Sequence, residues 1–319
     1  MEVEKMRRLE LLASEGFIKR AATVEGNMML KGSYVTRQYF PNPADRYPAD
    51  MDWVYTEHLK NDKRAREAFD AWAIAVTEVT MDDGITFRSF AENAFWRSID
   101  YAMHDDFPTV NTDLDCVVEG VEIVLSLDIS FNLDIPYSPI PLMYRPVGGE
   151  AFNIPYTVPL ALQVSWKIHQ TLVRPRFKDL FDLMYLVQHE SFDEETLERS
   201  FTALIAECDK DQISHDQIQL FLEYEFSHFF GGVQTMEAAW KYWRHGAYQK
   251  DFTMMLDYYD RSKNVLSAEL LPKKLPVFLA QLSAELLKAG INKELAGKLS
   301  ISPPKENKSS WWSSFFGKG

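Results

Sequence analysis

The segment from Met28 to Tyr55 constrains the fold more than any other part of the chain, because its pattern is that of a strand, a glycine turn and a second strand. The first strand is the short apolar run 28–30, and Gly32 follows it. Glycine lets the backbone turn sharply and lets a ligand approach the main-chain amides closely. In the second strand Asp50 and Asp52 alternate with apolar residues, which places both carboxylates on one face. The segment therefore predicts a sheet that carries two acids near a turn able to hold phosphate.

These residue types are the parts that nucleotidyl transfer requires. Mg²⁺ prefers hard oxygen ligands and keeps positions open for phosphate, so Asp50 and Asp52 are candidate ligands of Mg²⁺ or Mn²⁺. Gly32 and Ser33 are candidates for holding triphosphate oxygens. Either piece alone is common on solvated edges and in turns. Their succession in one segment favours a functional interpretation.

A segment rich in β-branched residues, 115–131, supplies a third candidate acid. Its alternation on both sides of Gly120 predicts a hairpin, and Asp128 lies on the face opposite to the apolar residues of the second strand. A solvated strand residue is the simpler explanation when Asp128 is taken alone. A carboxylate on a neighbouring strand, however, completes a metal site and acts as base toward an attacking hydroxyl. Asp128 is therefore the candidate, with Asp134 as the alternative.

Residues 161–188 carry a strong helical signal, interrupted at Pro175. Lysine and arginine on such helices can neutralise a triphosphate or the departing pyrophosphate. The plainer alternative is a solvated pair of helices with local ion pairs. The two aspartates are one helical turn apart, so they share a face and can orient the basic residues. The polar residues of these helices are Lys167, Arg176, Lys178, Asp179 and Asp182.

Together these motifs resemble the AbiEii/AbiGii nucleotidyltransferase toxin family of the DNA polymerase beta-like superfamily. The resemblance rests on LKGSYVTRQYF followed by RYPADMDW, and on the later RFKDLFDL, over residues 15–190. Ser126 stands where the family has a lysine, two residues before Asp128. The matching residues are Gly32, Ser33, Arg46, Asp50, Asp52, Asp128, Lys167, Arg176, Lys178, Asp179 and Asp182.

The resemblance implies magnesium-dependent transfer of a nucleotidyl group from a nucleoside triphosphate to an acceptor. Asp50, Asp52 and Asp128 are the expected metal ligands and, with Lys167, the expected catalytic residues. The expected nucleotide-binding residues are Gly32, Ser33, Arg46, Arg176, Lys178, Asp179 and Asp182.

The implied acceptor is RNA, at the acceptor end of transfer RNA. The implied setting is a toxin–antitoxin or phage-defence system, with a separately encoded antitoxin as partner. Two alternatives stay open at this point. One is transfer to a protein acceptor, and the other is a catalytically weak nucleotide-binding or partner-binding protein.

The composition of the chain limits the functions that these motifs allow. The net charge of −13 and the pI near 5.1 argue against broad coating of nucleic acid, which requires many lysines and arginines, and leave a small specific contact. Cys116 and Cys208 are the only cysteines, which excludes a disulfide framework and fits a reducing cytoplasm. No apolar run approaches the length of a transmembrane helix.

The expected fold class is α/β (α+β), in which a small mixed sheet is followed by a mainly helical lobe. We expect a nucleotidyltransferase core over 1–190, a helical lobe over 191–301 and a flexible aromatic tail over 302–319. Residues 136–149, rich in Pro and Gly, are expected to form a loop that leaves the sheet. Aromatic residues at helical spacing in the second lobe are expected to form its core. They are Phe221, Tyr224, Phe226, Phe229, Trp240 and Trp243.

Overall fold

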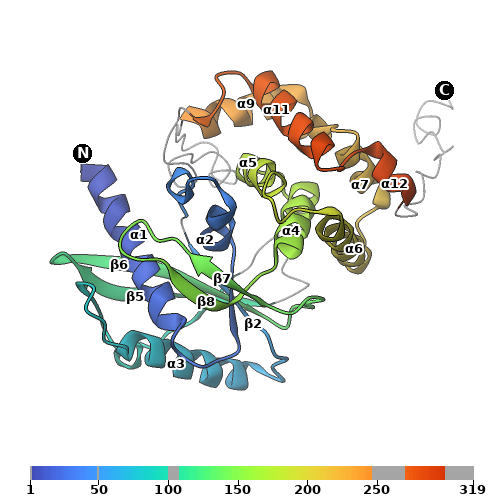
Figure 1. The fold of residues 1–319 in the computed structure, drawn as a ribbon. Helices are drawn as coiled ribbons and strands as arrows, with labels where there is room; N and C mark the ends of the chain where they lie inside the picture. Colours follow the sequence, from blue (N-terminus) through green and yellow to red (C-terminus); the bar gives the residue numbers. More distant parts are fainter. Residues whose placement is uncertain (1, 49, 100–107, 246–269, 299–319) are drawn as a thin grey trace, which may run out of the picture.

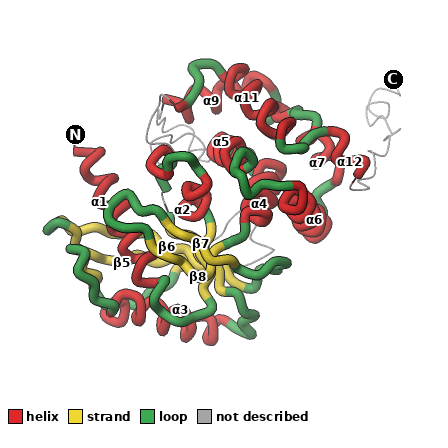
Figure 2. Tube along the Cα trace, in the orientation of Figure 1, coloured by secondary structure: helices red, strands yellow, loops and turns green. Residues whose placement is uncertain are grey.

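The computed structural model describes residues 2–48, 50–99, 108–245 and 270–298, so the aromatic tail predicted for 302–319 lies outside the described residues. The described part consists of an eight-stranded mixed sheet with helices, followed by further helices (Figures 1 and 2). The predicted fold class is confirmed. The strands are β1 (Met28–Lys31), β2 (Met51–Tyr55), β3 (Ile85–Phe87), β4 (Arg97–Ile99), β5 (Thr109–Val118), β6 (Val121–Phe131), β7 (Ile140–Tyr144) and β8 (Phe152–Thr157).

The sheet has the strand order β3-β5-β6-β2-β1-β8-β7, with β4 beside β5. β2 is antiparallel to β1 and parallel to β6, which places the two acid-bearing strands next to each other. β5 and β6 form the predicted hairpin. Its turn residues Glu119 and Gly120 have φ of 50° and 78°, as a tight turn that matches strand twist requires.

Helices α1 (Glu2–Ala21) and α3 (Asp62–Glu78) pack against one face of the sheet. Trp72 of α3 lies edge-on to both Phe17 of α1 and Trp53 of β2, with ring centroids 5.7 and 5.0 Å apart. Because side chains alternate along a strand, burying Trp53 on this face turns its neighbour Asp52 to the other. The short helix α2 (Ser33–Thr36) lies on the opposite side of the sheet from α3 (Figure 1).

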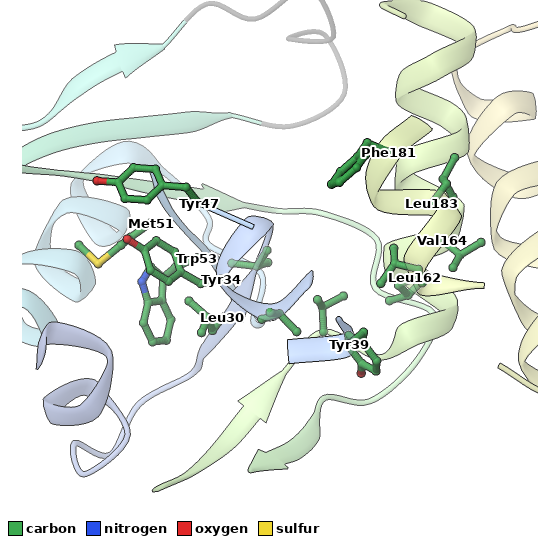
Figure 3. Close-up of a cluster of buried hydrophobic side chains, with 14 of the residues drawn as sticks. Leu30, Tyr34, Tyr39, Tyr47, Met51, Trp53, Leu162, Val164, Phe181 and Leu183 are labelled. Atoms are coloured by element: carbon green, nitrogen blue, oxygen red, sulfur yellow. The ribbon is translucent and has the colours of Figure 1, made fainter. Parts of the chain in front are cut away.

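Strand β8 leads the chain from the sheet into helices α4 (Leu160–Val173) and α5 (Phe177–Leu186). Leu30 of β1 pairs with Thr157 at the end of β8, and α4 begins three residues later. Figure 3 shows buried side chains of the sheet part, such as Leu30 and Trp53, and buried side chains of these two helices, such as Leu162 and Phe181. Helix α4 therefore begins directly after the strand that pairs with β1.

The later helices pack against α4 and α5. Phe177 at the start of α5 contacts an aromatic group formed by Phe230, Trp240, Trp243 and Phe278. The predicted aromatic core is confirmed for Phe221, Phe226, Trp240 and Trp243, which are buried, while Tyr224 and Phe229 are half-buried. The lobe boundary near residue 190 stays a prediction. These helices are α6 (Glu194–Lys210), α7 (His215–Leu222), α8 (Phe226–Phe229), α9 (Val233–His245), α11 (Leu275–Lys288) and α12 (Lys293–Lys298).

Two strands differ from the sequence-based expectation. β7 occupies part of the predicted loop 136–149, because an edge strand tolerates Pro141, whose missing N–H costs no interior hydrogen bond. The sequence patterns above did not predict β4, which is only three residues long. Searching the described helices reveals none that is both long and apolar enough to cross a membrane.

Candidate active site

Five polar residues on five neighbouring strands form one row across the sheet, which we call the polar row. Because residues paired in register point to the same face, the carboxylates of Asp52 and Asp128 are neighbours at the centre. A cationic side chain stands at each end. From one end to the other the row consists of Arg97 (β4), Asn111 (β5), Asp128 (β6), Asp52 (β2) and Lys31 (β1).

The glycine turn packs directly on Asp52. Gly32 has φ 71° and ψ −152°, a backbone conformation that residues with a side chain rarely adopt. A Cβ atom at Gly32 would lie 2.9 Å from the Cβ of Asp52, so glycine is also required for space. Ser33 follows, half-buried, and its hydroxyl makes no hydrogen bond with another described side chain or backbone group. The predicted phosphate turn thus lies directly against Asp52, one of the predicted acids.

Substituting Gly32 with alanine should therefore damage both the fold and the site. The strained backbone should cost about 1–3 kcal/mol of unfolding free energy. Displacement of the Asp52 carboxylate should lower nucleotidyl transfer by about 100-fold, the cost expected for a shift of about 1 Å in a reacting group. Urea unfolding and initial transfer rates measure the two effects. Gly84→Ala is the matched control, because Gly84 also has positive φ (72°) but a Cβ there would meet nothing within 4 Å; equal loss of transfer in both variants would contradict the role of Gly32 at Asp52.

Asp128 is oriented by Asn111. The Asn111 Nδ2 donates to Asp128 Oδ1 at 2.5 Å and to Ser126 Oγ at 2.8 Å. Arg97 Nη2 donates to Oδ1, the side-chain carbonyl oxygen of Asn111, at 2.5 Å. Because a guanidinium group only donates, Asn111 must turn its carbonyl to Arg97 and its amino group to Asp128. Ser126 accepts the second of these hydrogen bonds from Asn111 Nδ2 and so helps to hold Asn111.

The other two candidate acids lie differently. Asp50 stands immediately before β2, two residues from Asp52, and is exposed. The alternative acid Asp134 lies beyond the end of β6, where its side chain is 86% exposed and pairs with Lys210 at 3.0 Å. Asp50 thus adjoins Asp52 along the chain without belonging to the polar row, and Asp134 lies outside the row as well.

The oxygen donors of the polar row suit a small divalent cation. Mg²⁺ is commonly held by one or two carboxylates together with phosphate oxygens of the substrate. Within the described ranges, no group of three His, Cys, Asp or Glu side chains is arranged to hold a metal ion alone. The adjacent carboxylates of Asp52 and Asp128, with the Gly32 turn packed against Asp52, fit a cation that shares its ligands with a nucleotide.

A second group of charged residues, which we call the basic cluster, lies on α4, α5 and the segment before β2. Lys167 Nζ donates to Asp179 Oδ1 and to Asp182 Oδ2, at 2.7 Å each. Arg176 Nε donates to Asp179 Oδ2 at 2.6 Å. Arg46 forms a two-pronged pair with Asp182, at 2.6 and 3.1 Å. Three cations and two carboxylates leave this cluster with a net positive charge.

Burial and pairing set the protonation of the basic cluster. Burial alone would raise the pKa of Asp179, but Arg176 and Lys167 outweigh it and hold that pKa well below its usual range. The pKa of Asp182 is lowered in the same way by Arg46 and Lys167. Both carboxylates are fully buried and bonded to cations. Their geometry is that of residues that position Lys167, Arg176 and Arg46.

Lys178 stands apart from these pairs. Burial and then Arg176 lower its pKa to about 8. In the described part of the chain its side chain makes neither an ion pair nor a hydrogen bond. It is a cation that would gain from an anionic partner.

Two buried contacts attach the basic cluster to the acid-bearing part. Thr36 Oγ1 of α2 donates to Gln163 Oε1 of α4 at 2.8 Å, and Lys167 lies one helical turn further along α4. Arg46, which is 2% exposed, ties Asp182 of α5 to the segment that enters β2. The motifs that are separated in sequence are therefore joined through α2 and through Arg46. Sequence reasoning gave no role to Lys31, although it lies within LKGSYVTRQYF, and it missed Asn111 and Arg97, which belong to no recognised motif.

Comparison with known proteins identifies the family. A family model described as "Nucleotidyl transferase AbiEii toxin, Type IV TA system" matches residues 18–260. The chain belongs to the AbiEii family. It is therefore a nucleotidyltransferase of a toxin family, as the sequence motifs predicted. No curated protein matches the chain.

Two solved structures are similar to this AbiEii-family chain. One is JHP933 from Helicobacter pylori, with 15% identity and a TM-score of 0.42 over 93% of this chain and 95% of that one. The other is an H. pylori protein described as a nucleotidyltransferase, with 15% identity and a TM-score of 0.43 over 90% of this chain and 94% of that one.

Proposed function

We propose that this AbiEii-family enzyme transfers a nucleotidyl group from a nucleoside triphosphate to the terminal hydroxyl of an RNA, the acceptor end of transfer RNA, in the presence of Mg²⁺ or Mn²⁺. The observation that carries the proposal is the register of Asp52 with Asp128 beside the Gly32 turn. As a member of a toxin family it acts in the cytoplasm against its host cell, with a separately encoded antitoxin. Growth inhibition in a phage-defence setting is consistent with this activity.

The acids and the turn divide the work of the reaction. Gly32 and Ser33 hold triphosphate oxygens through backbone amides and the free hydroxyl. Asp50, Asp52 and Asp128 would hold the cation, which would neutralise phosphate charge. Asp128 also accepts the proton of the acceptor hydroxyl. The hydroxyl oxygen forms a bond to the α-phosphorus, the bond from that phosphorus to the bridging oxygen breaks, and pyrophosphate leaves with the electron pair.

The basic cluster serves the leaving group. Its net positive charge and the nearby Lys178 offset the charge that develops on pyrophosphate. Lys167 already donates two of its three N–H groups to Asp179 and Asp182, which leaves one for phosphate. The buried aspartates and Arg46 hold this lysine in place.

The pKa of Lys178 predicts a pH dependence of nucleotide binding. Below about pH 8 the lysine is protonated and can donate to phosphate, and above it the charge is lost. Affinity for triphosphate should therefore fall about tenfold as the pH rises from 7 to 9, the loss of roughly one charged hydrogen bond. Isothermal titration with a non-hydrolysable triphosphate measures this. Lys178→Gln should bind weakly and equally at both pH values; a pH dependence that persists in Lys178→Gln would exclude this lysine as its cause.

The class of acceptor is tested by following the transfer of a labelled nucleotide into RNA or protein. Each of the four α-labelled triphosphates is incubated with the enzyme, cellular RNA and cellular protein, with Mg²⁺ or with EDTA. We expect label in RNA, removed by trimming its 3′ ends and absent with EDTA. Label in the protein fraction would instead identify a protein acceptor, the first alternative. Nucleotide binding without label anywhere would identify the second, a binding protein with little turnover.

A further inference from the structure

The polar row has two ends, and only one of them adjoins the glycine turn. Lys31 directly precedes Gly32, and its Nζ lies 3.7 Å from Asp52 Oδ1. This end of the polar row is therefore on the side proposed for the triphosphate. The two carboxylates at the centre repel any substrate that carries phosphate. If both substrates carry phosphate, each needs a cation on its own approach to the acids. At the far end of the row, beyond Asp128, that cation is Arg97.

The guanidinium of Arg97 is held by one nitrogen and leaves two others available. Its Nη2 donates to Asn111 Oδ1 at 2.5 Å and to Asp113 Oδ1 at 2.6 Å. Neither Nη1 nor Nε has a partner among the described residues, and the side chain is 44% exposed. Nη1 therefore keeps its N–H groups for an anionic ligand, and a charged N–H donor to phosphate forms a strong hydrogen bond.

An exposed arginine–aspartate pair is by itself an ordinary surface feature. Arg97 differs because the nitrogen that binds Asp113 also binds Asn111, and Asn111 binds Asp128. The position of this cation is thus tied to the acid that receives the acceptor's proton. Arg88 offers a contrast, since among the described residues its side chain pairs with Glu92 and Asp115 and with neither acid of the polar row.

We propose that Arg97 binds a backbone phosphate of the acceptor, close to its terminal hydroxyl, so that the acceptor is recognised as a nucleic-acid strand on the Asp128 side of the polar row. This inference rests on the proposed function and names its acceptor-binding side. A contact of this kind agrees with an acidic chain of net charge −13, which is suited to a few placed cations and not to general coating.

Binding of RNA in the absence of nucleotide and metal tests the proposal without catalysis. The probe is a fluorescein-labelled single-stranded RNA with a free 3′-hydroxyl, followed by fluorescence anisotropy over a salt series. Arg97→Gln keeps a polar side chain but removes the charge and the Nη2 donor to Asn111 and Asp113. We expect it to weaken binding about tenfold at low salt and to reduce the slope of log Kd against log salt by about 0.7. The control Arg88→Gln, which removes the same charge from an exposed neighbour, should stay within about twofold.

Transfer kinetics supply the second arm. Arg97→Gln should raise KM for RNA about tenfold and leave KM for the triphosphate within about twofold. Equal RNA binding by the two variants, or no RNA binding by the wild type at low salt, would overturn the proposal. The proposal would also be overturned if the enzyme transferred the nucleotide to protein and Arg97→Gln left the rate of that transfer unchanged. If the wild type transfers nothing while Arg97→Gln still weakens RNA binding, the proposed function fails and the RNA contact stands.

Discussion

Replacing Asp182 with alanine is expected to lower the free energy of unfolding by about 3–5 kcal/mol, because it leaves buried charge without its partner. Asp182 is fully buried and Arg46 is 2% exposed, so water cannot replace the lost carboxylate. Lys167 would also lose one of its two acceptors. Urea unfolding at neutral pH, followed by tryptophan fluorescence, measures the change.

Two further variants make this prediction specific. Glu67→Ala removes a carboxylate from an exposed pair with Arg64, whose side chain is 72% exposed, and should change stability by less than about 0.5 kcal/mol. Asp182→Asn keeps the shape of the side chain and one acceptor oxygen. Its loss of unfolding free energy should therefore lie between those of Asp182→Ala and Glu67→Ala. If Asp182→Ala unfolds at the same urea concentration as Glu67→Ala, the buried pair does not hold α5 to the segment before β2.

Local sequence patterns were sufficient to predict Asp52 and Asp128 as candidate site residues, but not that these two residues are adjacent in the fold. Alternation along a strand places Asp52 opposite to the buried Trp53, and the same rule places Asp128 opposite to the apolar residues of its strand. Which residue of β2 pairs with which residue of β6 depends on contacts between distant segments. The pairing of Asp52 with Asp128 was therefore a hypothesis drawn from family resemblance, and the register shows it directly.

Asn111 is a residue that the sequence could have revealed. A two-residue turn at Glu119 and Gly120 pairs Val118 with Val121, and counting outward along both strands pairs Asn111 with Asp128. The predicted hairpin began at residue 115, which stopped the count too early. Extending it to the true start of β5, Thr109, would have placed an amide beside the candidate base.

Arg97 and Arg46 could not be placed in this way. β4, which carries Arg97, is three residues long, and so short a segment has too few positions for alternation to be recognised. The bidentate pair of Arg46 with Asp182 links residues 136 positions apart. Family resemblance singled out Arg46, but the structure was needed to show that its partner is an aspartate of α5.

The second large effect concerns Asp128. Asparagine at this position retains the size of the side chain and can still accept from Asn111, so the fold should be preserved. It cannot take up the proton of an acceptor hydroxyl, and it weakens the hold on a cation. Nucleotidyl transfer by Asp128→Asn is therefore expected to fall by about 1000-fold or more, since general acid–base catalysis alone contributes about 10²–10⁴-fold. Asp115→Asn, which removes a carboxylate from the neighbouring strand outside the polar row, should keep most activity.

Pyrophosphate release and label transfer, measured together in the same reaction, test most directly whether the polar row performs nucleotidyl transfer. The wild type and Asp115→Asn should release one pyrophosphate for each nucleotide transferred. Asp128→Asn and Asp52→Asn should neither release pyrophosphate nor transfer a nucleotide. Both of these variants should still unfold at the same urea concentration as the wild type. Transfer by folded Asp128→Asn and Asp52→Asn at the wild-type rate would contradict the assignment of the reaction to these two acids.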